Sequence, residues 1–198
     1  MLDGVDSGLT VPVWLLDVDG VLNTTRPGWG AAPRRAVAFS DGMNWPIRWA
    51  PALIDRIRGL HASRTVEIRW CTTWCPDAHQ LEGLFRLPCL PRALLMDPVP
   101  RGAEGRAAKL AAARSVLDDE GRCLVWTDDD AIPETWLLRD ELEAGGRALL
   151  IAPSPRRGLQ PSHLHSIEAF LRRHREAATV PQGSARRRLT RRRGAHVR

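Results

Sequence analysis

Five acidic side chains stand directly after two apolar segments of this sequence. They are Asp17 and Asp19, after residues 11–16, and Asp128, Asp129 and Asp130, after residues 123–127. If both segments are parallel strands of one sheet, their carboxyl ends meet at one edge and bring these carboxylates together. Several carboxylates in a small space repel one another unless a cation lies among them, and oxygen ligands suit Mg²⁺. The pattern therefore predicts a magnesium site.

Two further polar positions belong to the same expected edge. Thr72 and Thr73 follow the segment 66–70, and Lys109 lies in the first half of a predicted helix over 104–117. Lys109 is the single lysine among 29 basic residues, the others being arginine. A compact ammonium fits where a planar guanidinium does not, although chance can also leave one lysine in so arginine-rich a sequence.

Together these residue types are what phosphoryl transfer requires: a nucleophile, an acid–base group, a metal and a cationic clamp. A carboxylate nucleophile forms an aspartyl-phosphate, which water cleaves readily. A second carboxyl group two residues along can protonate the leaving oxygen and then deprotonate the attacking water. The sequence thus favours hydrolysis of a phosphate ester.

The elements that must position these residues alternate between two kinds. Buried strands are predicted at 11–16, 66–70, 92–96, 123–127 and 148–151. Helices are predicted from Pro51 onward and over 76–84, 104–117, 133–142 and 161–171. A short hairpin of 36–40 and 46–49 is expected to turn at Asp41-Gly42. This alternation predicts an α/β fold, a doubly wound (Rossmann-like) parallel sheet of about five strands.

The order of the polar residues resembles the four motifs of the haloacid dehalogenase-like (HAD) hydrolase superfamily. The resemblance covers about residues 11–171 and is carried by the DxDGV segment 17–21, Thr72, Lys109 and the pair Asp128-Asp129. It implies a Mg²⁺-dependent phosphatase that works through an aspartyl-phosphate.

The resemblance also implies a role for each site residue. Asp17 would be the nucleophile, Asp19 the general acid–base, Thr72 a hydrogen-bonding partner of the phosphoryl group and Lys109 a stabiliser of charge. The residues implied to hold the metal are Asp17, Asp128 and Asp129, with Asp19 contributing its backbone carbonyl. Thr72 is favoured over Thr73 as the strand-end residue. Asp130 is expected to be a helix N-cap or a solvated acid.

The space available around the site predicts a small HAD member without a large cap domain. Between Gly20 and Thr72 the chain has room for one helix and a small flap, and between Thr72 and Lys109 there is no room for an inserted domain. An open site favours a phosphorylated macromolecule that covers it, over a small metabolite. The segment 70–74 (WCTTW) also resembles the second motif of phosphatase modules attached to RNA-repair proteins.

Tryptophans are expected in two places. Trp14, Trp70 and Trp126 lie in predicted strands and should belong to the core. The tryptophans nearer the predicted mouth, which could line a substrate pocket, are Trp29, Trp45, Trp49 and Trp74.

Charge divides the chain into an expected extension (1–10), a HAD-like domain (11–171) and a tail (172–198). The formal charge is +6, but the tail holds ten arginines and one glutamate, so residues 1–171 are mildly acidic. The tail is poor in large apolar residues, which predicts disorder. Its arginines could hold nucleic acid through phosphate contacts, or the tail could be a solubilising extension without a partner. The alternative function is therefore a non-catalytic HAD-like module that binds nucleic acid through this tail.

Composition also restricts where the protein works. No apolar run approaches the roughly 18 residues of a membrane span. Residues 1–10 carry two acids and no basic residue, unlike a secretory signal. The four cysteines form no CxxC pair, which favours free thiols in the cytoplasm. The oligomeric state cannot be predicted.

Overall fold

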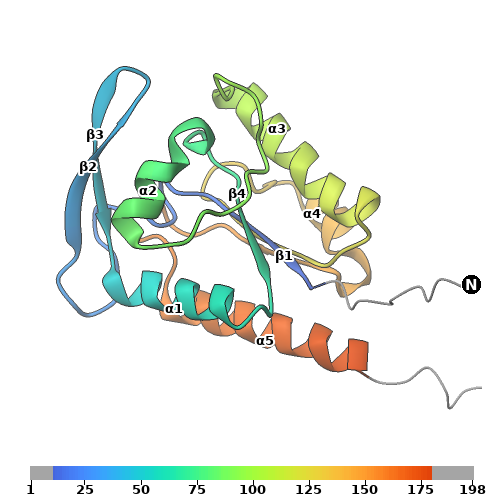
Figure 1. The fold of residues 1–198 in the computed structure, drawn as a ribbon. Coiled ribbons are helices and arrows are strands. Elements are labelled where there is room, and N and C mark those ends of the chain that lie inside the picture. Colours follow the sequence, from blue (N-terminus) through green and yellow to red (C-terminus); the bar gives the residue numbers. More distant parts are fainter. Residues whose placement is uncertain (1–10, 180–198) are drawn as a thin grey trace, which may run out of the picture.

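The computed structural model describes residues 11–179 of the protein, built around a four-stranded parallel sheet. The strand order is β4-β1-β5-β6 (Figure 1). The strands are β1 (Val13–Leu16), β4 (Glu67–Trp70), β5 (Leu124–Thr127) and β6 (Ala148–Ile151). The predicted α/β class with a Rossmann-like parallel sheet is confirmed. The predicted extension 1–10 lies outside the described residues.

Burial on both faces explains why the central strands are continuous apolar runs. Every residue of β1 and β5 is buried. Trp14, Trp70 and Trp126 are all fully buried, which confirms them as core residues. Trp14 also donates a hydrogen bond from its indole to the Thr127 hydroxyl at 3.0 Å, tying β1 to β5 through their side chains.

Helices cover both faces of the sheet (Figure 1). The pair α1 and α5 lies along one face, where Arg56 of α1 forms an ion pair with Glu168 of α5. On the other face lie α3 and α4. The helices are α1 (Pro51–Ala62), α2 (Ala78–Phe85), α3 (Gly102–Arg114), α4 (Trp136–Glu143) and α5 (Pro161–Thr179). None of these described helices combines the length and the apolar character that a membrane crossing requires.

The predicted hairpin is present and longer than expected. It consists of β2 (Arg34–Ser40) and β3 (Met43–Trp49), paired antiparallel. Asp41 and Gly42 both have positive φ, 50° and 73°, as a two-residue type I′ turn requires. The hairpin stands beside the sheet (Figure 1), in the segment where the sequence predicted a small flap.

Two predicted elements are corrected. The strand predicted at 92–96 is absent, and only Arg92 pairs there, as an isolated bridge to Trp70. Apolar composition is misleading in this segment, because Leu95 is 84% exposed and is not part of the core. The helix predicted to end at Leu171 continues to Thr179, so residues 172–179 of the predicted tail are helical. Residues 180–198 lie outside the described part of the chain.

Candidate active site

The carboxyl ends of β1 and β5 bring two acids and the lysine together. The strands pair in register, with Leu16 beside Thr127, so the next residues, Asp17 and Asp128, emerge side by side. Lys109 of α3 donates from Nζ to Asp17 Oδ2 at 2.9 Å and to Asp128 Oδ2 at 2.7 Å. All three side chains are buried. The sequence prediction that these three residues converge is confirmed.

Backbone donors fix the orientation of the Asp128 carboxylate. Its Oδ1 accepts the backbone N–H groups of Asp130 at 3.0 Å and Ala131 at 2.7 Å, which leaves Oδ2 for Lys109. Asp130 itself is turned outward, and its carboxylate pairs with Arg106 at 3.1 Å. Because α4 begins only at Trp136, Asp130 is not its N-cap. The other expectation for Asp130, an acid at the surface, is correct.

Asp129 completes a group of three carboxylates. One oxygen from each of Asp17, Asp128 and Asp129 lies within 4.8 Å of the others. Gly20 makes this approach possible, because a Cβ there would lie 2.1 Å from the Asp129 carboxyl carbon. Gly20 also has a φ of +69°, which disfavours other residues. The loop after β1 thus closes directly onto Asp129.

The electrostatics of this group indicate excess negative charge. Burial and the neighbouring Asp128 raise the pKa of Asp17 from 3.8 to about 7. The same two causes raise the pKa of Asp129 to about 6. Burial alone would lower the pKa of Lys109, but Asp17 and Asp128 raise it above its ordinary value. One ammonium among three carboxylates leaves negative charge that a divalent cation would neutralise. Asp17, Asp128 and Asp129 therefore fit the predicted metal site.

Asp19 is not one of these three carboxylates and has hydrogen-bond partners of its own. Its Oδ1 accepts a hydrogen bond from Asn23 Nδ2 at 2.7 Å, and its Oδ2 accepts one from Trp74 Nε1 at 2.9 Å. Asn23 in turn accepts the backbone N–H of Arg48 in β3 at 2.8 Å, so its amide joins Asp19 to the hairpin. The expected metal contact of Asp19 is through its backbone carbonyl and stays a prediction.

Asn23 is a site residue that the sequence prediction missed. Its backbone N–H donates to Val18, and its carbonyl accepts from Gly20, which holds the turn after β1 closed. An asparagine four residues after Asp19 was the available signal, since a short amide side chain can hydrogen-bond a carboxylate within the same turn.

The two threonines after β4 are placed differently. Thr72 is buried, and its Oγ1 accepts the backbone N–H of Trp74 at 3.4 Å. Thr73 lines a hollow beside Asp19 instead. Within residues 11–179 neither hydroxyl makes a hydrogen bond to the three carboxylates, so the role expected of Thr72 stays a prediction.

The hollow beside Asp19 lies at the tip of the hairpin. It measures about 90 Å³, and Trp45 and Trp74 form part of its wall. Arg101, just before α3, closes one side by forming an ion pair with Asp41 of the hairpin turn. Two of the four expected mouth tryptophans are therefore at the mouth.

The other two of those tryptophans are elsewhere. The Trp29 indole donates to the Leu159 carbonyl at 2.7 Å, and Trp49 packs edge-on against Phe85 with ring centroids 5.2 Å apart. Their proximity to the site in sequence was misleading, because Trp49 lies at the base of the hairpin and the residues of the hairpin that line the hollow beside Asp19 are Ser40, Asp41 and Trp45.

Comparison of the sequence with models of known protein families finds no match, and comparison with curated proteins finds none. The resemblance to HAD hydrolases therefore depends on the motif residues and on their arrangement around Asp17.

Proposed function

We propose that this protein is a HAD-like, Mg²⁺-dependent phosphatase that hydrolyses phosphomonoesters through a phosphorylated Asp17. The observation that carries the proposal is the convergence of Asp17, Asp128, Asp129 and Lys109 at the carboxyl ends of parallel strands. These residues come from three separate segments of the chain, and a purely structural ion pair would need one acid for one lysine rather than three.

In the first step, an Asp17 carboxylate oxygen attacks phosphorus and the bond from phosphorus to the leaving oxygen breaks. Asp19 gives its proton to that oxygen, so the product leaves as a neutral alcohol. The Lys109 ammonium, 2.9 Å from Asp17, stabilises negative charge on the transferring phosphoryl group. A divalent cation held by Asp17, Asp128 and Asp129 would supply further neutralisation of phosphate charge.

In the second step, Asp19 takes a proton from a water molecule as its oxygen bonds to phosphorus. The bond between phosphorus and the Asp17 oxygen then breaks, which releases inorganic phosphate and restores the carboxylate. Asn23 and Trp74 support this division of labour, since they hydrogen-bond Asp19, whereas Lys109 hydrogen-bonds Asp17 and Asp128. The two aspartates of DxD can thus perform different tasks.

The hollow at the hairpin tip is suited to the leaving group. It borders Asp19, the proposed proton donor, and two indole rings supply apolar surface. In the described residues the hairpin is the one element inserted between β1 and α1, so no large domain closes over the hollow. The arrangement suits substrates that extend beyond the pocket.

A phosphatase screen tests this function directly. Full-length protein would be assayed with Mg²⁺ or with EDTA on aryl phosphates, nucleotides, phosphopeptides and phosphorylated oligonucleotides. We expect hydrolysis that Mg²⁺ supports, that EDTA abolishes and that Asp17→Asn lacks. Asp130→Asn is the matched control, because it removes an acid at the same edge of the sheet whose carboxylate pairs with Arg106 at the surface.

Two outcomes would contradict the proposal. Hydrolysis by Asp17→Asn at the wild-type rate would exclude Asp17 as the nucleophile. Absence of Mg²⁺-dependent hydrolysis across the whole panel would favour the non-catalytic binding module.

A further inference from the structure

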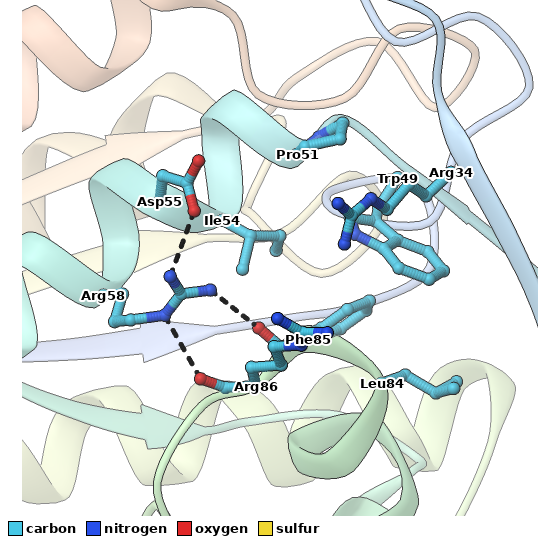
Figure 2. A pocket seen from close by; sticks show the side chains of 9 residues that line it. All are labelled: Arg34, Trp49, Pro51, Ile54, Asp55, Arg58, Leu84, Phe85 and Arg86. Atoms are coloured by element: carbon cyan, nitrogen blue, oxygen red, sulfur yellow. Dashed lines mark hydrogen bonds and ion pairs between the residues drawn. The ribbon is translucent and has the colours of Figure 1, made fainter.

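A second hollow lies at the base of the hairpin, whereas the hollow beside Asp19 lies at its tip. Figure 2 shows it between Arg34 and Trp49 at the hairpin base, the first two turns of α1, and the end of α2. Its volume is about 110 Å³. Pockets for drug-sized ligands measure roughly 300–1,000 Å³, so this hollow suits a small chemical group.

One of its three arginines has a structural role. Arg58 of α1 donates to Asp55 Oδ1 and to the backbone carbonyls of Phe85 and Arg86, each at 3.1 to 3.2 Å (Figure 2). These bonds satisfy carbonyl groups at the end of α2, which lack partners within the helix. Arg58 therefore fixes the backbone from which Arg86 extends.

The other two arginines, Arg34 and Arg86, have guanidinium groups without a partner among residues 11–179. Neither side chain makes a hydrogen bond or ion pair within residues 11–179, and both extend toward the hollow from opposite sides (Figure 2). Arg86 has a φ of 53° at the C-terminal cap of α2, a position where glycine is usual. The protein thus carries an arginine side chain at a position whose backbone favours glycine.

The charges and the wall define what this hollow can bind. Three guanidinium groups face a single carboxylate, Asp55, and the remaining wall is aromatic and aliphatic. Guanidinium groups donate paired N–H bonds, which match the oxygens of a phosphate group. We propose that the hollow binds a phosphate-type oxyanion between Arg34 and Arg86.

This site is independent of the proposed catalytic chemistry. The cluster around Asp17 has excess negative charge and would repel a free anion in the absence of a metal, whereas the hollow at the hairpin base attracts one. An anion bridging Arg34 of β2 and Arg86, the cap residue of α2, would also join the hairpin to the end of that helix. Binding can therefore be measured on metal-free protein without any assay of turnover.

Isothermal titration of inorganic phosphate into full-length protein tests the site. The buffer contains EDTA, and its ionic strength is kept constant during the titration. The key variant is the double substitution Arg34→Ala with Arg86→Gly. Glycine suits the positive φ at position 86, so the variant should melt no lower than the wild type. Arg34→Ala alone is compared with Arg35→Ala as its matched control, since both remove one positive charge and Arg35 is the next residue of β2, on its opposite face.

We expect the double variant to bind phosphate at least tenfold more weakly, and Arg35→Ala to bind as the wild type does. Unchanged affinity in the double variant, or a loss in Arg35→Ala equal to that in Arg34→Ala, would overturn the proposal. Loss of binding in Lys109→Ala instead would place the anion at the carboxylate cluster and also overturn it. Acetate binding as tight as phosphate would show that charge alone is recognised, contrary to the proposal.

A parallel titration with methyl phosphate distinguishes two sources of the oxyanion. Equal affinities for methyl phosphate and inorganic phosphate would assign the site to the free ion. Tighter binding of the ester would assign it to the phosphate group of a phosphorylated organic molecule, which also supports the site.

Discussion

The two ends of the β2–β3 hairpin border sites of opposite charge. Near the tip, Asp19 lines one hollow, and two residues before it Asp17 belongs to a group of three carboxylates, of which the buried pair Asp17 and Asp128 shares one lysine. At the base, Arg34 and Arg86 are exposed and lack partners among residues 11–179. A buried charge must be compensated where it lies, whereas an exposed guanidinium is solvated at little cost. The three carboxylates are therefore held in one arrangement, whereas the guanidinium groups of Arg34 and Arg86 can bind a ligand.

This difference predicts unequal effects of mutation. Changes in the buried group should alter both activity and stability, because each carboxylate influences its neighbours. Changes at the hairpin base should alter anion binding alone.

Lys109→Arg should have the largest effect on turnover among substitutions that retain charge. The larger, planar guanidinium cannot replace a buried ammonium that contacts Asp17 and Asp128 at the same time. Losing one electrostatic contact of this kind costs about 10²–10³ in kcat. Steady-state kinetics would measure this, with Arg106→Lys on the exposed side of α3 as the control. Near-normal activity in Lys109→Arg would show that Lys109 is dispensable for charge stabilisation.

Trp74→Phe should have a smaller effect that depends on the leaving group. Phenylalanine keeps an aromatic ring but removes the donor that holds Asp19 Oδ2. Alkyl phosphates need protonation of the leaving oxygen more than aryl phosphates do, so kcat should fall about tenfold for the alkyl ester and less for the aryl ester.

The matched control for Trp74→Phe is Trp45→Phe. The Trp45 indole borders the same hollow but donates to the Ser40 carbonyl at 3.0 Å rather than to Asp19. It should show no preference between the two esters. An equal loss on both esters in Trp74→Phe would reduce Trp74 to a packing residue.

Asp17→Asn should make the metal-free protein more stable at pH 8, by a few degrees in Tm. The folded protein holds a proton on Asp17 up to about pH 7, whereas the unfolded chain loses it near its ordinary pKa of 3.8. Stability of the wild type therefore falls as pH rises through that interval, and asparagine removes this loss.

Thermal unfolding at pH 4 and pH 8, with and without Mg²⁺, measures this effect. The advantage of Asp17→Asn should be small at pH 4 and larger at pH 8, and Mg²⁺ should reduce it by stabilising the wild type. A variant less stable than the wild type at pH 8 without metal would show that Asp17 stabilises the fold through Lys109 and that excess negative charge is absent.

The sequence predicted the parts of the site that depend on strand ends. Asp17 and Asp128 each follow a continuous apolar run, so their meeting required only the correct pairing of two parallel strands. The direction of the Asp19 carboxylate was not predictable, because it depends on donors from Asn23 and Trp74 in two different loops.

The remaining differences between the sequence predictions and the structure come from packing between segments that are far apart in sequence. Residues 92–96 are apolar enough for a strand, but their pairing with β4 stops after one residue. The three arginines of the hairpin base are more than twenty positions apart in sequence and have no shared pattern. Only the packing of α2 against α1 and the hairpin brings them to one hollow.

The most direct test of the central claim is chemical trapping of the phosphorylated residue. Asp19→Asn would be mixed with Mg²⁺ and an aryl phosphate, because this variant still permits attack on a good leaving group but activates water poorly. Borohydride reduces an aspartyl-phosphate to homoserine, which peptide mass spectrometry locates. The account predicts homoserine at position 17, dependent on substrate and absent when Asp17→Asn is added to the variant. The contrary result would be that the wild type hydrolyses the same substrate while the Asp19→Asn variant shows no homoserine at position 17. That result would contradict a phosphorylated Asp17.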